Sequence, residues 1–293
     1  MVAYALALLS AAFYGAADFL GGLASRGMAT VTVVVVSQAA GLIVLLALLP
    51  FISDSLASSR DLAWGLAAGV SGSSGVALLY RALSIGTMAI VAPVTAVCAV
   101  IIPVAAGVLL GERLPAQTIA GIGVALVAIV LVSHQGPAAG TDASAHAGLP
   151  AGLGLAMVSG VAIGIFFLTL AQTTDEAGLW PLVSARAVSL VLFGGFLIVR
   201  TSAIGRSDRL TGQSGLPRQA LALALIGGIL DMLANALYLL AAREGPLTAV
   251  VTLSSLYPAS TVVLARVVLH ERLQAAQMGG IAAALVAVVL IVS

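Results

Sequence analysis

Ten apolar runs, each about as long as a membrane-crossing helix, occupy most of the chain, and short polar or Gly/Pro-rich stretches separate them. A helix needs about 20 mostly apolar residues to cross about 30 Å of hydrocarbon. Their Leu, Ala, Val and Ile content favours helices, whereas barrel strands would alternate over about ten residues. The pattern predicts an all-α integral membrane protein with ten transmembrane helices: residues 3–23, 30–51, 62–83, 87–110, 116–133, 149–171, 181–199, 218–241, 247–269 and 274–292.

The fifth and tenth runs, together with the turns that enter them, repeat one another. Residues 112–132 and 271–291 align without a gap, and 12 of the 21 positions are identical. The shared Glu-Arg-Leu turn argues against a chance match, because charged residues are rare in this chain. We therefore predict two five-helix repeats, residues 1–133 and 149–293, joined by a linker loop at 134–148. Because five is odd, the copies enter the membrane in opposite directions, as in many secondary transporters.

The composition supports the membrane assignment. Hydrophobic residues make up 61% of the chain and charged residues only 8%, against about 25% charged residues in a soluble domain. A net charge of +1 provides no basic surface for nucleic acid. The single cysteine, Cys98, excludes an internal disulfide and a cysteine metal cluster. The N-terminus lacks a basic n-region, so we expect a retained first span, with a cleaved signal peptide as the alternative.

Two short turns carry a family resemblance. Gly111–Arg113 and His270–Arg272 each precede a Gly-containing final helix, and together with the opening FYGAADFLGGLASR they resemble the drug/metabolite transporter superfamily, in its EamA-like ten-span branch. Pro258, thirteen residues before Glu271, also fits. The resemblance covers essentially the whole chain and implies a transporter of amino acids or other metabolites. It implies cytoplasmic ends, whereas seven arginines against three would place the ends outside, so the orientation stays open.

Polar side chains inside the spans are the candidate site. A charged group at a helix centre costs about 2.5–3.5 kcal/mol on insertion scales, so each one needs a reason. Asp18 lies deep in the first span, with Tyr14 one turn earlier on the same face. Asp231, Asn235 and Tyr238 form one stripe on the eighth span. We favour a pathway for substrate or protons at these positions over hydrogen bonding between helices.

Other polar residues fit more than one role. Arg186, in the first turns of the seventh span, fits a pathway residue, an ion-pair partner of a carboxylate or a side chain that snorkels to the membrane surface. Gln38 and Tyr257 either line the cavity or hydrogen-bond neighbouring helices. Glu112 and Glu271 are expected to cap the last helix of each half, where the helix dipole favours negative charge.

No motif indicates catalysis, a metal or a cofactor. Residues 69–72 read GVSG, as in intramembrane serine proteases, but that chemistry needs a histidine base within reach. The histidines lie in loops or at a span end: His134, His146 and His270. HERLQ lacks the second histidine of a zinc motif. We read the Gly-rich segment 65–75 as a helix-packing surface.

These patterns predict a multi-pass protein of the plasma (inner) membrane that is not an enzyme. The expected function is secondary transport of a small metabolite, an amino acid or related amphiphilic compound, by alternating access in the direction of export. Two buried acids and no buried Lys or His favour cation-containing substrates or proton exchange. The expected partners are the substrate, the lipid bilayer and protons, with no nucleic acid, and the protein is a monomer or homodimer. The alternatives are a membrane enzyme or scaffold without transport, an uptake carrier for a sugar-like solute, and a passive channel.

Overall fold

The computed structural model describes residues 1–52, 57–86, 88–112, 114–132, 152–204, 217–268 and 275–292. These ranges are helical nearly throughout and contain no β-strand. The helices of the first half are α1 Val2–Gly27, α2 Thr30–Ile52, α3 Ser59–Ile85, α4 Met88–Leu109 and α5 Ala116–Val132. Those of the second half are α6 Leu153–Leu170, the short 3-10 helix η1 Asp175–Ala177, α7 Trp180–Ile204, α8 Arg218–Glu244, α9 Leu247–Ser254, α10 Tyr257–Val268 and α11 Ala275–Val292. The prediction of an all-α protein is confirmed.

Six of these helices are long and apolar enough to cross a membrane, within the part of the chain that the structure describes: α1, α2, α3, α6, α7 and α8. Shorter apolar stretches lie in α4, α5 and α11. Many large apolar side chains on the outer helix faces are exposed, as lipid-facing surfaces require. The chain is therefore a multi-pass membrane protein.

The ninth apolar run, predicted as one span over 247–269, is broken in two. α9 ends at Ser254 and α10 begins at Tyr257. Pro258 explains the break, because it has no N–H to donate to the carbonyl of Ser254 and its ring crowds that carbonyl. Hydropathy alone does not predict this interruption, because the residues around the break are as apolar as their neighbours.

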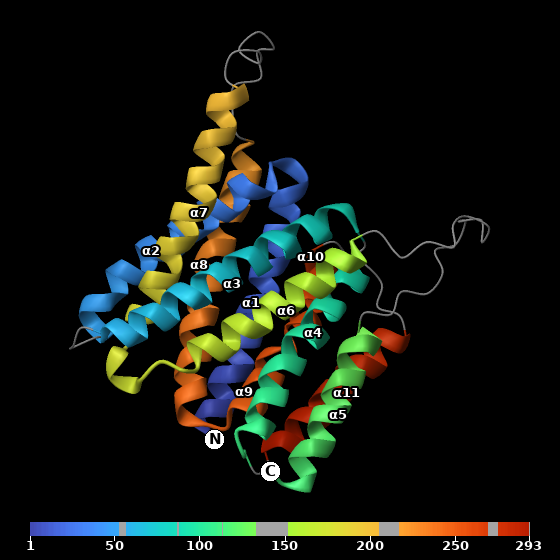
Figure 1. The fold of residues 1–293 in the computed structure, drawn as a ribbon. Coiled ribbons are helices and arrows are strands. Elements are labelled where there is room, and N and C mark those ends of the chain that lie inside the picture. The colour runs from blue at the N-terminus through green and yellow to red at the C-terminus, as the bar shows by residue number, and fades with distance from the viewer. Residues whose placement is uncertain are drawn as a thin grey trace.

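Helices pack mainly against helices of the other half, with smaller contacts inside each half. α1 packs along α8 and also contacts α9 and α10, while α3 packs along α6 and α7. α2 lies against α7 and α8, and α4 lies against α6. α5 and α11 pair with each other at one edge of the bundle, and the two chain ends lie at the same end of the molecule (Figure 1). This interleaving leaves the bundle centre lined by both halves.

Small residues let these helices approach closely. A side chain at Gly69 of α3 would collide with the backbone of Ala185 of α7. A side chain at Gly228 of α8 would collide in the same way with the backbone of Ser37 of α2. The predicted role of the Gly-rich segment 65–75 in helix packing is confirmed at Gly69, because even one methyl group would separate the two backbones.

The turn after α4 differs from the expected cap of the following helix. Gly111 has a φ of +86°, a left-handed conformation that favours glycine, and it ends α4. The carboxylate of Glu112 then accepts hydrogen bonds from the backbone N–H of Thr248, at 3.3 Å, and from its hydroxyl. Glu112 therefore stabilises the N-terminus of α9 in the other half, where the helix dipole favours an anion, and not that of α5. Its counterpart Glu271 lies outside the described residues.

Candidate functional site

A small cavity lies at the bundle centre, between helices of both halves. It encloses about 60 Å³, which is room for a few water molecules at most. Seven of the eight residues predicted from sequence line it: Tyr14, Asp18, Gln38, Arg186, Asp231, Asn235 and Tyr257. The structure thus brings together side chains from α1, α2, α7, α8 and α10 that are up to 243 positions apart in sequence.

Arg186 is the central charge of this cavity. Its side chain is 4% exposed, so the snorkelling alternative is wrong for this residue. Nη2 of Arg186 lies 2.5 Å from Oδ2 of Asp231, and Nη1 donates a hydrogen bond to Oε1 of Gln38. One guanidinium therefore joins α7 to α8 and α2, and the charge of Asp231 is neutralised inside the protein. The sequence left this ion pair open as one of several alternatives for Arg186.

A second hydrogen-bonded group joins α1 to α8. The hydroxyl of Tyr14 donates to Oδ1 of Asn235 at 2.8 Å, and Nδ2 of Asn235 donates to the carbonyl of Asp231 at 2.6 Å. This arrangement fixes the side-chain amide of Asn235 with its oxygen towards α1. It also leaves Asp18, one turn beyond Tyr14, half-buried on the same helix face.

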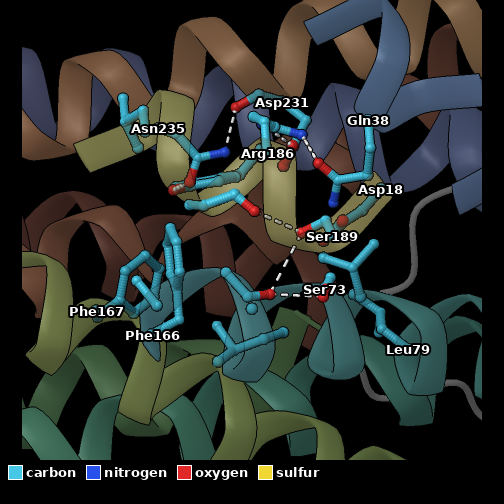
Figure 2. Close-up of a pocket in the computed structure, with 18 of the residues that line it drawn as sticks. Asp18, Gln38, Ser73, Leu79, Phe166, Phe167, Arg186, Ser189, Asp231 and Asn235 are labelled. Carbon is cyan, nitrogen blue, oxygen red and sulfur yellow. Dashed lines mark hydrogen bonds and ion pairs between the residues drawn. The ribbon is translucent and has the colours of Figure 1, made fainter. Parts of the chain in front are cut away.

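The opposite side of the cavity is apolar and was missed by the sequence interpretation. Figure 2 shows Phe166, Phe167 and Leu79 facing the charged and amide side chains across the cavity. We call these residues, with two neighbours that also line the cavity, the apolar wall: Val76, Leu79, Ile163, Phe166 and Phe167. They belong to α3 and α6. A hydropathy profile gave no signal, because every residue of the wall looks like an ordinary lipid-facing or core position.

Serine hydroxyls between the two sides are used by the helices themselves. Ser73 donates to the carbonyl of Gly69 at 2.5 Å, and Ser189 donates to the carbonyl of Ala185 at 2.8 Å. These bonds satisfy hydroxyl groups that would otherwise be unpaired in an apolar setting. They lie within or between α3 and α7, so these serines serve helix structure in this conformation.

Tyr238 is the one predicted residue that does not line the cavity. It is fully buried, and its hydroxyl donates to the carbonyl of Phe167 at 2.9 Å. The rings of these two residues lie 4.5 Å apart, centroid to centroid. Tyr238 therefore supports the apolar wall from behind, which is the helix-bonding alternative considered from sequence.

The described residues offer no set of three His, Cys, Asp or Glu side chains placed to hold a metal ion. The three histidines of the chain, His134, His146 and His270, lie outside the described residues. The chemistry that the cavity itself provides is a carboxylate, an internal ion pair, an amide and an apolar wall. That set is suited to binding and orienting a small molecule, and among the described lining residues it contains no nucleophile with an adjacent base.

Comparisons with known proteins agree with this architecture. A model of the EamA-like transporter family matches residues 1–134 and 150–293. One solved crystal structure is similar over 96% of this chain and 96% of its own chain, with a TM-score of 0.60 and 19% sequence identity. At that identity the likeness extends to the fold alone. No curated protein matches the sequence.

Proposed function

The chain belongs to the EamA-like transporter family, and on that premise we propose that it is a secondary transporter for a small metabolite that works by alternating access. The observation that carries the proposal is the central cavity, in which charged side chains from both halves meet among membrane-crossing helices. Ionisable groups at such depth usually mark a pathway for substrate or ions. The proposed substrate is an amino acid or a related amphiphilic compound, moved outward across the plasma (inner) membrane.

We further propose that ten spans form two inverted repeats, residues 1–133 and 149–293, with 134–148 as the linker. Paired hydrogen bonds support this arrangement. Ser10 on α1 donates to the carbonyl of Ala234 on α8 at 2.8 Å, and Ser159 on α6 donates to the carbonyl of Gly75 on α3 at 2.7 Å. The two donors are 149 positions apart and the two acceptors 159, as expected if α6 repeats α1 and α8 repeats α3.

A second pair of bonds follows the same two offsets. Thr95 on α4 donates to the carbonyl of Ala156 on α6 at 3.2 Å, and Ser254 on α9 donates to the carbonyl of Ala7 on α1 at 3.4 Å. Here the donors are 159 positions apart and the acceptors 149. The offset of 159 is also that of the repeated turns before α5 and α11. One consistent pair of offsets over several helices is difficult to explain without a duplication.

The proposed mechanism follows from the two halves sharing one cavity. Substrate enters between them and contacts Asp18, Tyr14, Asp231 and Asn235. It leaves on the opposite side after the halves rock against each other. A cavity of about 60 Å³ is smaller than an amino acid, so the proposed mechanism requires the cavity to widen when substrate enters. Asp18 is also the proposed group for exchange of protons against substrate.

Reconstitution tests the proposal. Purified protein in liposomes is assayed for uptake and efflux of a panel of labelled amino acids and other metabolites, with and without a pH gradient. We expect saturable transport that Asp18→Asn reduces at least about tenfold. Asp175→Asn is the matched control, because the Asp175 side chain is 81% exposed and does not line the cavity.

Several outcomes contradict the proposal. Normal transport by both Asp18→Asn and Asp231→Asn would place the pathway elsewhere. No transport of any compound in the panel favours a membrane protein without transport activity. Currents far above carrier turnover indicate a channel. Transport that proceeds equally with and without a pH gradient contradicts only the proposed proton exchange.

A further inference from the structure

Most polar groups in the cavity already satisfy one another. Arg186 neutralises Asp231 and donates to Gln38, while Tyr14, Asn235 and the backbone of Asp231 form a continuous hydrogen-bonded series. Each of these side chains therefore has a partner before any ligand arrives. A ligand that bound them would first have to break bonds within the protein.

Asp18 and Tyr257 are the exceptions among the described cavity residues. No hydrogen bond or ion pair reaches the carboxylate of Asp18 from any residue that the structure describes. Tyr257 is only 3% exposed, and its buried hydroxyl has no hydrogen-bond partner among the residues that the structure describes. Both residues line the cavity. With Arg186 and Asp231 balancing each other, an ionised Asp18 would add one uncompensated negative charge to the cavity, which is costly inside a membrane unless a bound cation offsets it.

Aromatic rings line the same cavity as this carboxylate. The ring of Tyr14, one turn from Asp18, meets Phe167 edge to face at 5.9 Å and Tyr257 at 6.4 Å. Phe166 and Phe167 are themselves 5.5 Å apart. Ring faces attract organic cations, and they do so most strongly where water is excluded. A cavity lined by both a carboxylate and a cluster of rings is suited to an ammonium group that carries hydrocarbon.

We propose that the cavity takes a monovalent organic amine, with its ammonium group on Asp18 and its hydrocarbon or aromatic body on the apolar wall. Figure 2 shows the geometry that supports this: Asp18 lies with the polar side chains, and Phe166, Phe167 and Leu79 face them. The proposal rests on the proposed transport function and narrows its substrate class.

The charges of the cavity favour an amine over a zwitterionic amino acid. The carboxylate of an amino acid would need its own cation, and Arg186 is already occupied by Asp231 and Gln38. A zwitterion carries no net charge, so it would not balance an ionised Asp18. A dication would bring one more positive charge than the single unpaired carboxylate can balance. One positive charge on an otherwise apolar molecule is the complement that balances the site.

The experiment compares three probes that share a ring: phenethylamine, phenylalanine and 3-phenylpropionate. Equilibrium binding of each labelled probe is measured with the full-length protein in nanodiscs. We expect phenethylamine to bind at least about tenfold more tightly than either of the other probes. Asp18→Asn should weaken phenethylamine binding at least tenfold, Asp18→Glu should retain much of it, and Asp175→Asn should leave it unchanged. Phe166→Leu should weaken phenethylamine but not butylamine, which has no ring.

The outcomes separate this inference from the transport proposal. Phenylalanine binding as tightly as phenethylamine would overturn the amine assignment while leaving transport intact. Wild-type affinity in a folded Asp18→Asn variant would overturn the role of Asp18. Binding of none of the three probes, alongside transport of some other metabolite in the panel, would also reject the inference and keep the transporter. Absence of transport for every compound would reject the underlying proposal itself.

Discussion

The ion pair between Arg186 and Asp231 makes a sharp prediction about stability. At 2.5 Å and an effective dielectric constant of about 20, the attraction is about 7 kcal/mol, and it offsets a desolvation cost of several kcal/mol for each ion. The two side chains are only 5% and 15% exposed, so solvent screens the pair little. Asp231→Asn leaves a buried guanidinium without its counter-charge, and we expect it to lower the free energy of unfolding by about 3–5 kcal/mol.

Removing both charges should cost much less than removing one. We expect Arg186→Met to destabilise by an amount similar to Asp231→Asn, because each single change leaves one buried charge unpaired. The double variant should return to within about 1 kcal/mol of the wild-type protein, since replacing a buried ion pair by neutral groups is often close to neutral. The expected coupling energy of the cycle is therefore at least about 5 kcal/mol.

The assay is an SDS titration in mixed micelles, followed by the fluorescence of the two tryptophans, Trp64 on α3 and Trp180 on α7. Asp18→Asn is the informative comparison, because no described residue forms a hydrogen bond or ion pair with the Asp18 carboxylate. It should leave the unfolding midpoint unchanged or raise it, while Asp231→Asn lowers it. Additive effects of the two changes in the Arg186–Asp231 cycle, or equal destabilisation by Asp18→Asn and Asp231→Asn, would refute the assignment of Asp231 as a structural counter-ion.

Two further predictions concern contacts away from the charges. Gly69→Ala should lower the free energy of unfolding by about 1–3 kcal/mol, because the new methyl group meets the backbone of Ala185. The control is Gly123→Ala, where no atom lies near the new methyl group. In the same titration it should be neutral or stabilise by up to about 1 kcal/mol. Glu112→Gln should cost about 1–3 kcal/mol by weakening the bonds from Thr248, and a double-mutant cycle with Thr248→Val checks it: independent effects would contradict the contact.

Hydropathy was sufficient to locate most helices, because membrane crossing constrains length and composition together. The break between α9 and α10 was the main departure. It depends on one missing N–H at Pro258, which a sliding average over about 19 residues does not register. The same proline was noticed in the sequence, but only as a family feature. The missing N–H of Pro258 and the crowding of its ring against the carbonyl of Ser254 predict the break, but a hydropathy average includes neither effect.

The polar half of the cavity was predictable because buried charge is costly and therefore rare. Asp18, Asp231 and Asn235 stand out in otherwise apolar spans, and all three line the cavity. The partner of Arg186 was not predictable, because choosing between two carboxylates requires knowing which helices are neighbours. The apolar wall left no compositional trace either. Repeat offsets would have pointed to it: 149 positions after Tyr14 and Asp18 come Ile163 and Phe167, two of its members.

Under the proposed repeat, the two sides of the cavity occupy equivalent positions with opposite chemistry. Asp18 on α1 corresponds to Phe167 on α6, and Asp231 on α8 corresponds to Gly72 on α3. A side chain at Gly72 would collide with the ring of Phe166, at 2.6 Å, so the ring occupies the space that the second half gives to a carboxylate. The wall therefore excludes an acid at position 72. The two copies therefore give the cavity one side with charged side chains and one apolar side.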